Sequence, residues 1–167
     1  MFSLGYTCVT LVHNTIVMSK MKNIMAGLGG AIALNILHES LKKKNSDMPR
    51  VDLLGEEALQ KTLHYFGTEI EGEKPLYAAT LAGDVLSNAM YYSMIGNGGP
   101  NNVWVRAVAY GVAAGVGAIT LPEPMGLDPE PVTKSNTSKA LTVGYYVAGA
   151  LVTAALIKAI SGKKEPK

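Results

Sequence analysis

Apolar residues in this chain gather into runs of about 20 residues, and polar stretches separate the runs. The runs cover residues 23–41, 76–95, 103–121 and 140–160. A helix rises about 1.5 Å per residue, so about 20 apolar residues cross the hydrocarbon core of a bilayer. The pattern predicts an all-α integral membrane four-helix bundle, a single membrane domain over residues 20–162. Alanine and glycine replace much of the leucine, which leaves open a soluble helical bundle with small core residues.

A shorter segment, residues 51–66, has apolar positions at helical spacing between the first and second runs. Leu54, Ala58 and Leu59 share one side, and Glu57 and Lys61 lie opposite. This pattern predicts a short amphipathic helix, on the membrane surface or packed over the bundle. Packing is favoured over binding of a partner.

The remaining connections differ in length and composition. Residues 96–102 are short, polar and uncharged, which predicts an antiparallel hairpin of the second and third spans. The connection after residue 121 holds four prolines, which predicts an extended, polyproline-like crossing. The first and third connections lie on one side of a four-span protein, and the basic run at residues 42–44 favours the cytoplasmic side.

Both ends of the chain lie outside the predicted membrane domain. Residues 1–19 are fairly apolar but contain His13 and Asn14, and too few residues separate them from the first run for a turn between two spans. They are interpreted as an N-terminal extension without an assigned role. Residues 163–167 form a basic tail.

The composition agrees with membrane helices that pack closely. Charged residues make up 17% of the chain, compared with about 25% in soluble proteins. Small residues four positions apart let helix backbones approach one another. The candidate packing positions are Ala26 and Gly30, Gly111 and Gly115, and Gly144 and Ala148. We expect the lipid bilayer as one partner, and a second copy or a membrane complex as another. The net charge of +2 is too small to indicate nucleic acid.

One acidic residue, Asp84, lies near the middle of the second run. A carboxylate in hydrocarbon costs about 2.5 kcal/mol or more. If the first two spans are antiparallel, Asn35 lies about 9 Å and Asp84 about 12 Å below the same surface, so the two can form a hydrogen bond. Asn88 follows Asp84 by one turn, and we expect His38 and Glu39 at the mouth of the resulting polar cavity.

This cluster predicts a small transport or conduction protein for protons or cations. The candidate pathway residues are Asp84, Asn35, Asn88, His38 and Glu39. A structural interpretation is also open, in which the two asparagines and Asp84 only fix how the helices pack. The alternative function is a non-catalytic assembly subunit of a membrane complex. A membrane enzyme that acts on a lipid or quinone is the least favoured, because no nucleophile with a base, metal-ligand spacing or cofactor motif is evident.

Overall fold

The computed structural model describes the backbone of residues 3–99 and 101–162, and the side chains of residues 19–99 and 101–162. In chain order the elements are α1 (Ser3–Leu41), α2 (Val51–Tyr65), α3 (Glu73–Ser93), the 3-10 helix η1 (Met94–Gly98), α4 (Val103–Thr120), α5 (Glu130–Thr133) and α6 (Asn136–Gly162). No strand occurs within these ranges, so the all-α prediction is confirmed for them. The predicted basic tail lies outside the described residues, as do the side chains of the N-terminal extension through residue 18.

Three helical segments of the described chain are long and apolar enough to cross a membrane. They are Ser19–Leu41, Val103–Thr120 and Asn136–Gly162. At 21 residues α3, the second predicted span, has the length of a spanning helix but is not among the three. Its polar residues, Asp84 and Asn88 foremost, lower its hydropathy. Association with a membrane is therefore supported by three helices rather than four.

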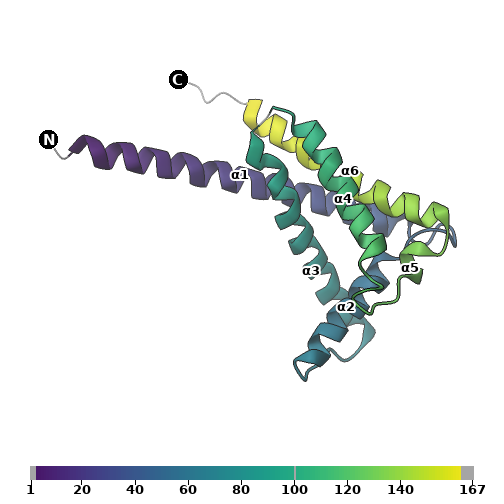
Figure 1. Cartoon of the computed structure of the whole chain (residues 1–167). Helices are drawn as coiled ribbons and strands as arrows, with labels where there is room; N and C mark the ends of the chain where they lie inside the picture. The colour runs from purple at the N-terminus through teal and green to yellow at the C-terminus, as the bar shows by residue number, and fades with distance from the viewer. Residues whose placement is uncertain (1–2, 100, 163–167) are drawn as a thin grey trace.

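The contacts between the long helices give the order α3, α1, α6, α4. Figure 1 shows α4 beside α6 at one end of this order. α1 packs along both α3 and α6, and α6 packs along α4. The helices α3 and α4, which follow one another in the chain, therefore stand at the two ends of the row. The predicted hairpin is present, but its two arms are held mainly by other helices rather than by each other.

Glycines allow the closest backbone approaches in this row. A Cβ atom on Gly149 of α6 would lie 2.9 Å from the carbonyl oxygen of Gly30 of α1. The same atom would lie 2.9 Å from the hydroxyl of Tyr92, a fully buried side chain of α3 that donates a hydrogen bond to the Tyr146 carbonyl at 2.8 Å. α1, α3 and α6 therefore meet at one point, where Gly30 and Gly149 have no side chain.

Of the predicted packing positions, most lie at helix contacts. A Cβ atom on Gly111 would lie 2.7 Å from the Cα atom of Val147, and Ala26 is fully buried. The prediction that Gly144 is a packing position is wrong, because this residue is exposed and an added Cβ atom would meet nothing within 4 Å. The contact of α6 with α1 uses Gly149 instead. The other two predicted positions, Gly115 and Ala148, are buried and half-buried respectively.

The first and third connections pack against each other and form a cap over one end of the helices. The Arg50 amide donates a hydrogen bond to the Pro131 carbonyl at 2.9 Å, and the Ser138 hydroxyl donates one to the Asp47 carbonyl at 2.8 Å. Leu54, Leu127 and Val132 form a second small core there. The ends of α1 and α4 therefore lie on one side, which we call the cap side.

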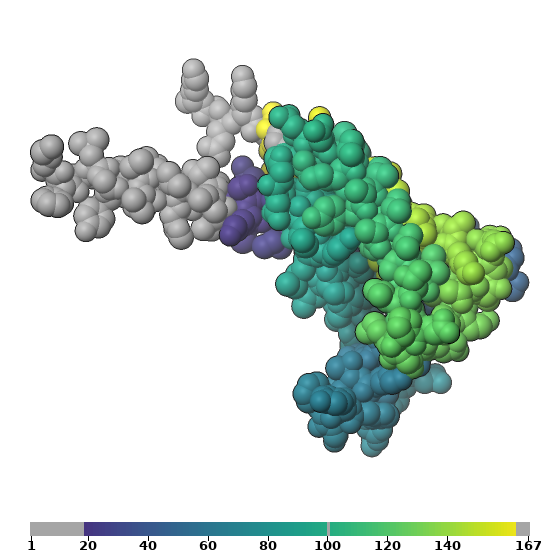
Figure 2. Space-filling model, viewed as in Figure 1, coloured from purple at the N-terminus to yellow at the C-terminus, as the bar shows by residue number. Residues whose placement is uncertain are grey.

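α2 is packed over other helices, which is one of its two predicted placements. It contacts α3 and α5 and forms a lobe with the turn that follows it (Figure 2). One prediction about the connections needs correction. The proline-rich connection is not extended. It turns at residues 122–127, where the Leu127 amide donates to the Pro122 carbonyl at 2.8 Å, and then forms α5. The fixed φ of proline suits the first turn of a helix, so Pro129 and Pro131 start α5 rather than prevent it.

Arg106 closes the opposite end of the hairpin. Its guanidinium donates hydrogen bonds to the carbonyl oxygens of Ile95 at 2.8 Å, of Asn101 at 2.7 Å and of Gly99. Just inside this loop, the Tyr91 hydroxyl of α3 donates to the Tyr110 carbonyl of α4 at 3.0 Å. Closer to the cap, the facing sides of α3 and α4 line a groove of about 590 Å³.

Candidate functional site

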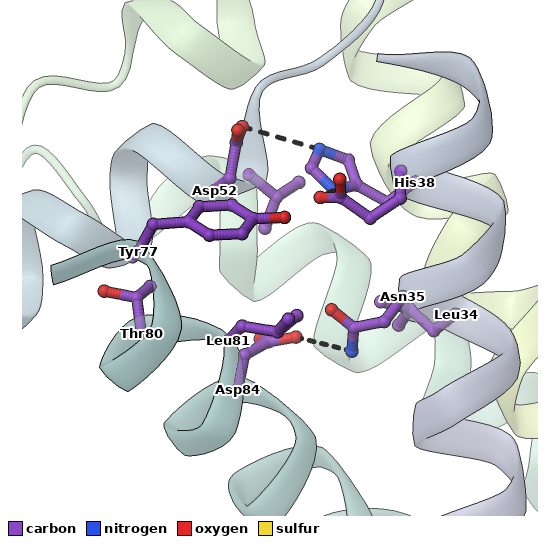
Figure 3. Close-up of a pocket in the computed structure, with 11 residues that line it drawn as sticks. Leu34, Asn35, His38, Asp52, Tyr77, Thr80, Leu81 and Asp84 are labelled. Atoms are coloured by element: carbon purple, nitrogen blue, oxygen red, sulfur yellow. Dashed lines mark hydrogen bonds and ion pairs between the residues drawn. The ribbon is translucent and has the colours of Figure 1, made fainter. Parts of the chain in front are cut away.

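Asp84 receives hydrogen bonds from two asparagine side chains. The Asn35 amide nitrogen on α1 donates to Asp84 Oδ2 at 2.9 Å (Figure 3), and the Asn88 amide nitrogen donates to Oδ1 at 2.8 Å. Residues 84 and 88 share one face of α3 because they are four positions apart. The predicted hydrogen bond between the first and second runs is therefore present. Both asparagines are buried.

The partners of the Asp84 carboxyl group are neutral. Among the described residues, no lysine or arginine forms an ion pair with it. Arg106, the one arginine in the α3–α4 hairpin, is held by backbone carbonyls in the loop. Amide donors stabilise a carboxylate, but a charge in an apolar environment still lacks compensation without a cation or a proton. Asp84 is therefore suited to bind one or the other.

His38 lies one turn closer to the cap than Asn35, beneath the start of α2. Its Nε2 atom is 3.6 Å from Asp52 Oδ1 (Figure 3), and its Nδ1 atom is 3.5 Å from Glu39 Oε1. The side chain is 5% exposed, so His38 does not stand at an open mouth as expected. The start of α2 covers it. Glu39 is 35% exposed and lies nearer the surface.

Asp52, which is not among the predicted site residues, is the centre of the charged groups. The Arg50 guanidinium donates to both of its carboxylate oxygens, at 2.8 and 2.9 Å. The Lys42 ammonium donates to Asp52 at 3.1 Å and to Glu39 at 2.7 Å. We call these four residues, with His38, the cap cluster. They come from the end of α1, the start of α2 and the turn between them.

Asp52 stays ionised in this environment. Burial raises the pKa of its carboxyl group, but the hydrogen bonds from Arg50 and Lys42 outweigh burial and lower that pKa to about 2. Burial likewise lowers the pKa of the Lys42 ammonium, and its hydrogen bonds to Glu39 and Asp52 raise it overall. Opposite charges therefore hold the start of α2 on the end of α1 at neutral pH. The sequence does contain one indication of this role. Asp52 lies in the first turn of a predicted helix, a position that favours negative charge.

A narrow cavity of about 30 Å³ joins the cap cluster to Asp84. It is lined by Asn35, His38, Asp52, Thr80 and Asp84, among others (Figure 3). Two buried polar atoms on its wall, His38 Nε2 and Thr80 Oγ1, have no hydrogen-bond partner among the described residues. A cavity of this size holds one or two water molecules, and water needs polar partners of this kind. The cavity therefore brings polar groups of the cap cluster and Asp84 to one space, and Leu34, Val51 and Leu81 form the apolar part of its lining.

The described residues contain no group of three or more His, Cys, Asp or Glu placed to hold a metal ion. Comparison with known protein families, curated proteins and solved structures finds no match to this chain. The function therefore has to be inferred from the geometry around Asp84.

Proposed function

We propose that this chain is a small membrane protein whose helices α1, α3, α4 and α6 all cross the bilayer. The connections support α3 as the fourth span. α1 and α4 both end at the cap, where the Arg50 amide binds the Pro131 carbonyl. α3 begins at the cap, and α4 begins at the other end of the helices. If α4 crosses the bilayer toward the cap, α3 has to cross it in the opposite direction first.

We propose further that the protein carries out proton-linked transport, with Asp84 as the proton-binding group. The observation that carries this proposal is the cavity that connects Asp84 to the cap cluster. At one end, two amides orient the Asp84 carboxyl group at 2.8 and 2.9 Å. At the other end lies His38, a side chain type that exchanges protons near neutral pH. The cavity wall between them carries polar atoms that can bind water.

The residues then have separate roles. Glu39 is partly exposed and lies 3.5 Å from His38 Nδ1, so it marks the entrance from the cap side. His38 passes protons on to water in the cavity through its Nε2 atom, which makes no hydrogen bond to a described residue and lies 3.6 Å from Asp52 Oδ1. Asp84 receives the proton and loses its charge, which lowers the cost of a carboxyl group in the bilayer. Asn35 and Asn88 hold Asp84 in place, and Asp52 fixes His38 and Lys42 at the cap.

Protons are favoured over metal cations by the size and lining of the cavity. Hard cations such as Ca²⁺ take six to eight oxygen ligands, and smaller ions retain several water molecules. A cavity of about 30 Å³ has no room for a hydrated ion. A proton needs only a chain of hydrogen bonds.

Proton flux into liposomes tests this function. Purified protein is reconstituted with a pH-sensitive dye inside the vesicles, and the Asp84→Asn variant is measured beside the wild type. Asparagine has the same shape and can keep one hydrogen bond with Asn35 or Asn88, so we expect the variant to remain folded and its flux to fall at least tenfold. Equal flux in both proteins would contradict the proposal. The elution profile of each protein from a sizing column controls for folding.

An assembly subunit is the second candidate, and the outer face of α1 favours it. A stripe of large apolar side chains runs along this face and is exposed in the part of the chain that the structure describes. Its members are Met21, Ile24, Met25, Leu28, Ile32 and Ile36. In a bilayer such a stripe faces lipid or another membrane helix. Extraction in mild detergent distinguishes the two, because an assembly subunit elutes with a partner and an independent protein elutes alone or with copies of itself.

A further inference from the structure

The groove between α3 and α4 is separate from the narrow cavity, and Asp84 borders both. One wall is formed by α3 and the other by α4, with Tyr146 of α6 between them. The α4 wall carries small residues, namely Ala113, Ala114, Gly117 and Ala118. Residues of α2 and of the turn at residues 122–127 close the groove toward the cap. Its volume of about 590 Å³ lies within the range of sites for drug-sized molecules.

The groove is apolar except along the α3 wall and at Tyr146 of α6. Asp84 is the only charged residue among those that line it. Ser87 and Asn88 lie beside it, and the rings of Tyr91 and Tyr146 complete the polar part of the lining. None of the residues that line the groove has a basic side chain, so a cation that pairs with Asp84 from the groove side would be supplied by a ligand. Tyrosine rings also attract cations.

The position of the groove indicates how a ligand enters. It opens between α3 and α4, the two ends of the helix row, rather than toward the cap. If both helices cross the bilayer, this opening faces lipid. A molecule that reaches it has to dissolve in the hydrocarbon region and still carry a charge for Asp84.

We propose that the groove binds a lipophilic organic cation with a single positive charge, which pairs with the Asp84 carboxylate. This inference rests on the proposed function and names its substrate class. The apolar body of the cation lies against the small residues of α4, and its charge lies against the α3 wall. A proton and an organic cation then compete for the same carboxylate from its two sides, one through the cavity and one through the groove.

Binding of tetraphenylphosphonium to the full chain in lipid nanodiscs tests the proposal. The matched groove variant is Gly117→Leu. An added Cβ atom at Gly117 meets only the Leu121 side chain, at 3.5 Å, so the new side chain fills the groove without disturbing the helix contacts. Gly144→Leu is the control, because this glycine of α6 is exposed and does not line the groove. Neutral triphenylphosphine oxide controls for partition into lipid.

We expect saturable binding to the wild type and to Gly144→Leu, and at least tenfold weaker binding to Gly117→Leu and to Asp84→Asn. The neutral compound should bind at least tenfold more weakly than the cation. Equal binding by all four proteins, or no saturable binding to any, would overturn the proposal. Proton flux measured on the same samples separates the two hypotheses. Flux that depends on Asp84 without cation binding rejects the substrate class alone, whereas flux that is unchanged in Asp84→Asn rejects the proposed function.

Discussion

The side-chain amide of Asn35 donates a hydrogen bond of 2.9 Å to the Asp84 carboxylate, and this contact joins α1 to α3 across 49 positions of sequence. Both side chains lie inside helices that also meet where Gly27 packs against Ala89, and near the cap where Lys42 contacts Tyr77. The contact therefore does two things at once. It sets how α1 and α3 are rotated against each other, and it orients the only carboxyl group among the residues that line the groove.

A double-variant cycle measures the strength of this contact. Removal of one partner from a buried hydrogen bond costs about 1–3 kcal/mol, because the other partner loses its compensation. We expect Asn35→Leu to lower the free energy of unfolding by about that amount in a wild-type background. In an Asp84→Asn background the loss should be smaller by about 0.5 kcal/mol or more. Denaturant titration in mixed micelles provides the four values, and strictly additive losses would show that the contact contributes nothing.

The cap cluster predicts an acid-sensitive attachment of α2. The pKa of Asp52 is about 2 in the folded protein, below its ordinary value of 3.8. A lowered pKa adds stability that is fully present above about pH 4 and is lost as the pH falls toward 2. The expected loss is about 2 kcal/mol. Hydrogen exchange at α2 amides, compared between pH 5 and pH 2.5, should show faster opening in acid.

Asp52→Asn is the control for this acid effect. The variant should open faster than the wild type at pH 5, because Arg50 and Lys42 lose their charged partner. Between pH 5 and pH 2.5 it should change less than the wild type. An equal acid response in the two proteins would assign the effect to other carboxyl groups.

Two glycines of α6 provide a matched test of the helix packing. A Cβ atom on Gly149 would lie 2.9 Å from the Gly30 carbonyl oxygen, whereas one on Gly144 meets nothing within 4 Å. We expect Gly149→Val to separate α1 from α6 and to abolish a monodisperse folded protein. Gly144→Val should behave as the wild type. Size-exclusion profiles in detergent compare them, and similar behaviour of the two variants would be inconsistent with the described α1–α6 contact.

Removal of the Tyr92 hydroxyl should lower the stability of the fold by less than a substitution at Gly149. The hydroxyl is buried among α1, α3 and α6 and donates to the Tyr146 carbonyl at 2.8 Å. Tyr92→Phe keeps the ring and removes only this hydrogen bond, so the expected cost is about 1 kcal/mol. Tyr65→Phe is the control, since that side chain is 86% exposed. Thermal unfolding should separate the two variants, and an equal midpoint for both would mean that the hydroxyl makes no net contribution.

The sequence predicts most of the helices because their apolar runs are long and separated by polar residues. The runs at residues 103–121 and 140–160 become α4 and α6 with small changes at their ends. The contact between Asn35 and Asp84 follows from depth along antiparallel helices, which depends only on helical rise. The shared side of the first and third connections follows from counting spans.

The packing glycines, the role of Asp52 and the groove depend on which helix faces meet. The pattern of apolar and polar residues does not specify these faces. α4 and α6 carry small apolar residues on several sides, so Gly144 and Gly149 are equally suitable from sequence alone. Asp52 was not identified because its partner Lys42 lies ten residues away, at the other end of the connection between α1 and α2, and charged residues at a helix start are commonly solvated. The groove was not predicted because α3 and α4 follow one another in the chain, and consecutive helices usually pack together.

Infrared difference spectroscopy of the carboxyl groups tests the central claim that Asp84 exchanges protons with the cap side through the cavity. Protein in liposomes is cycled between about pH 5 and pH 9, a range over which most carboxyl groups at the surface stay ionised. We expect a protonated carboxyl band that is absent from Asp84→Asn and that rises at least tenfold more slowly in His38→Phe. If Asp84→Asn retained every carboxyl band of the wild type, Asp84 would not change its protonation state, and the account of proton transfer would be wrong.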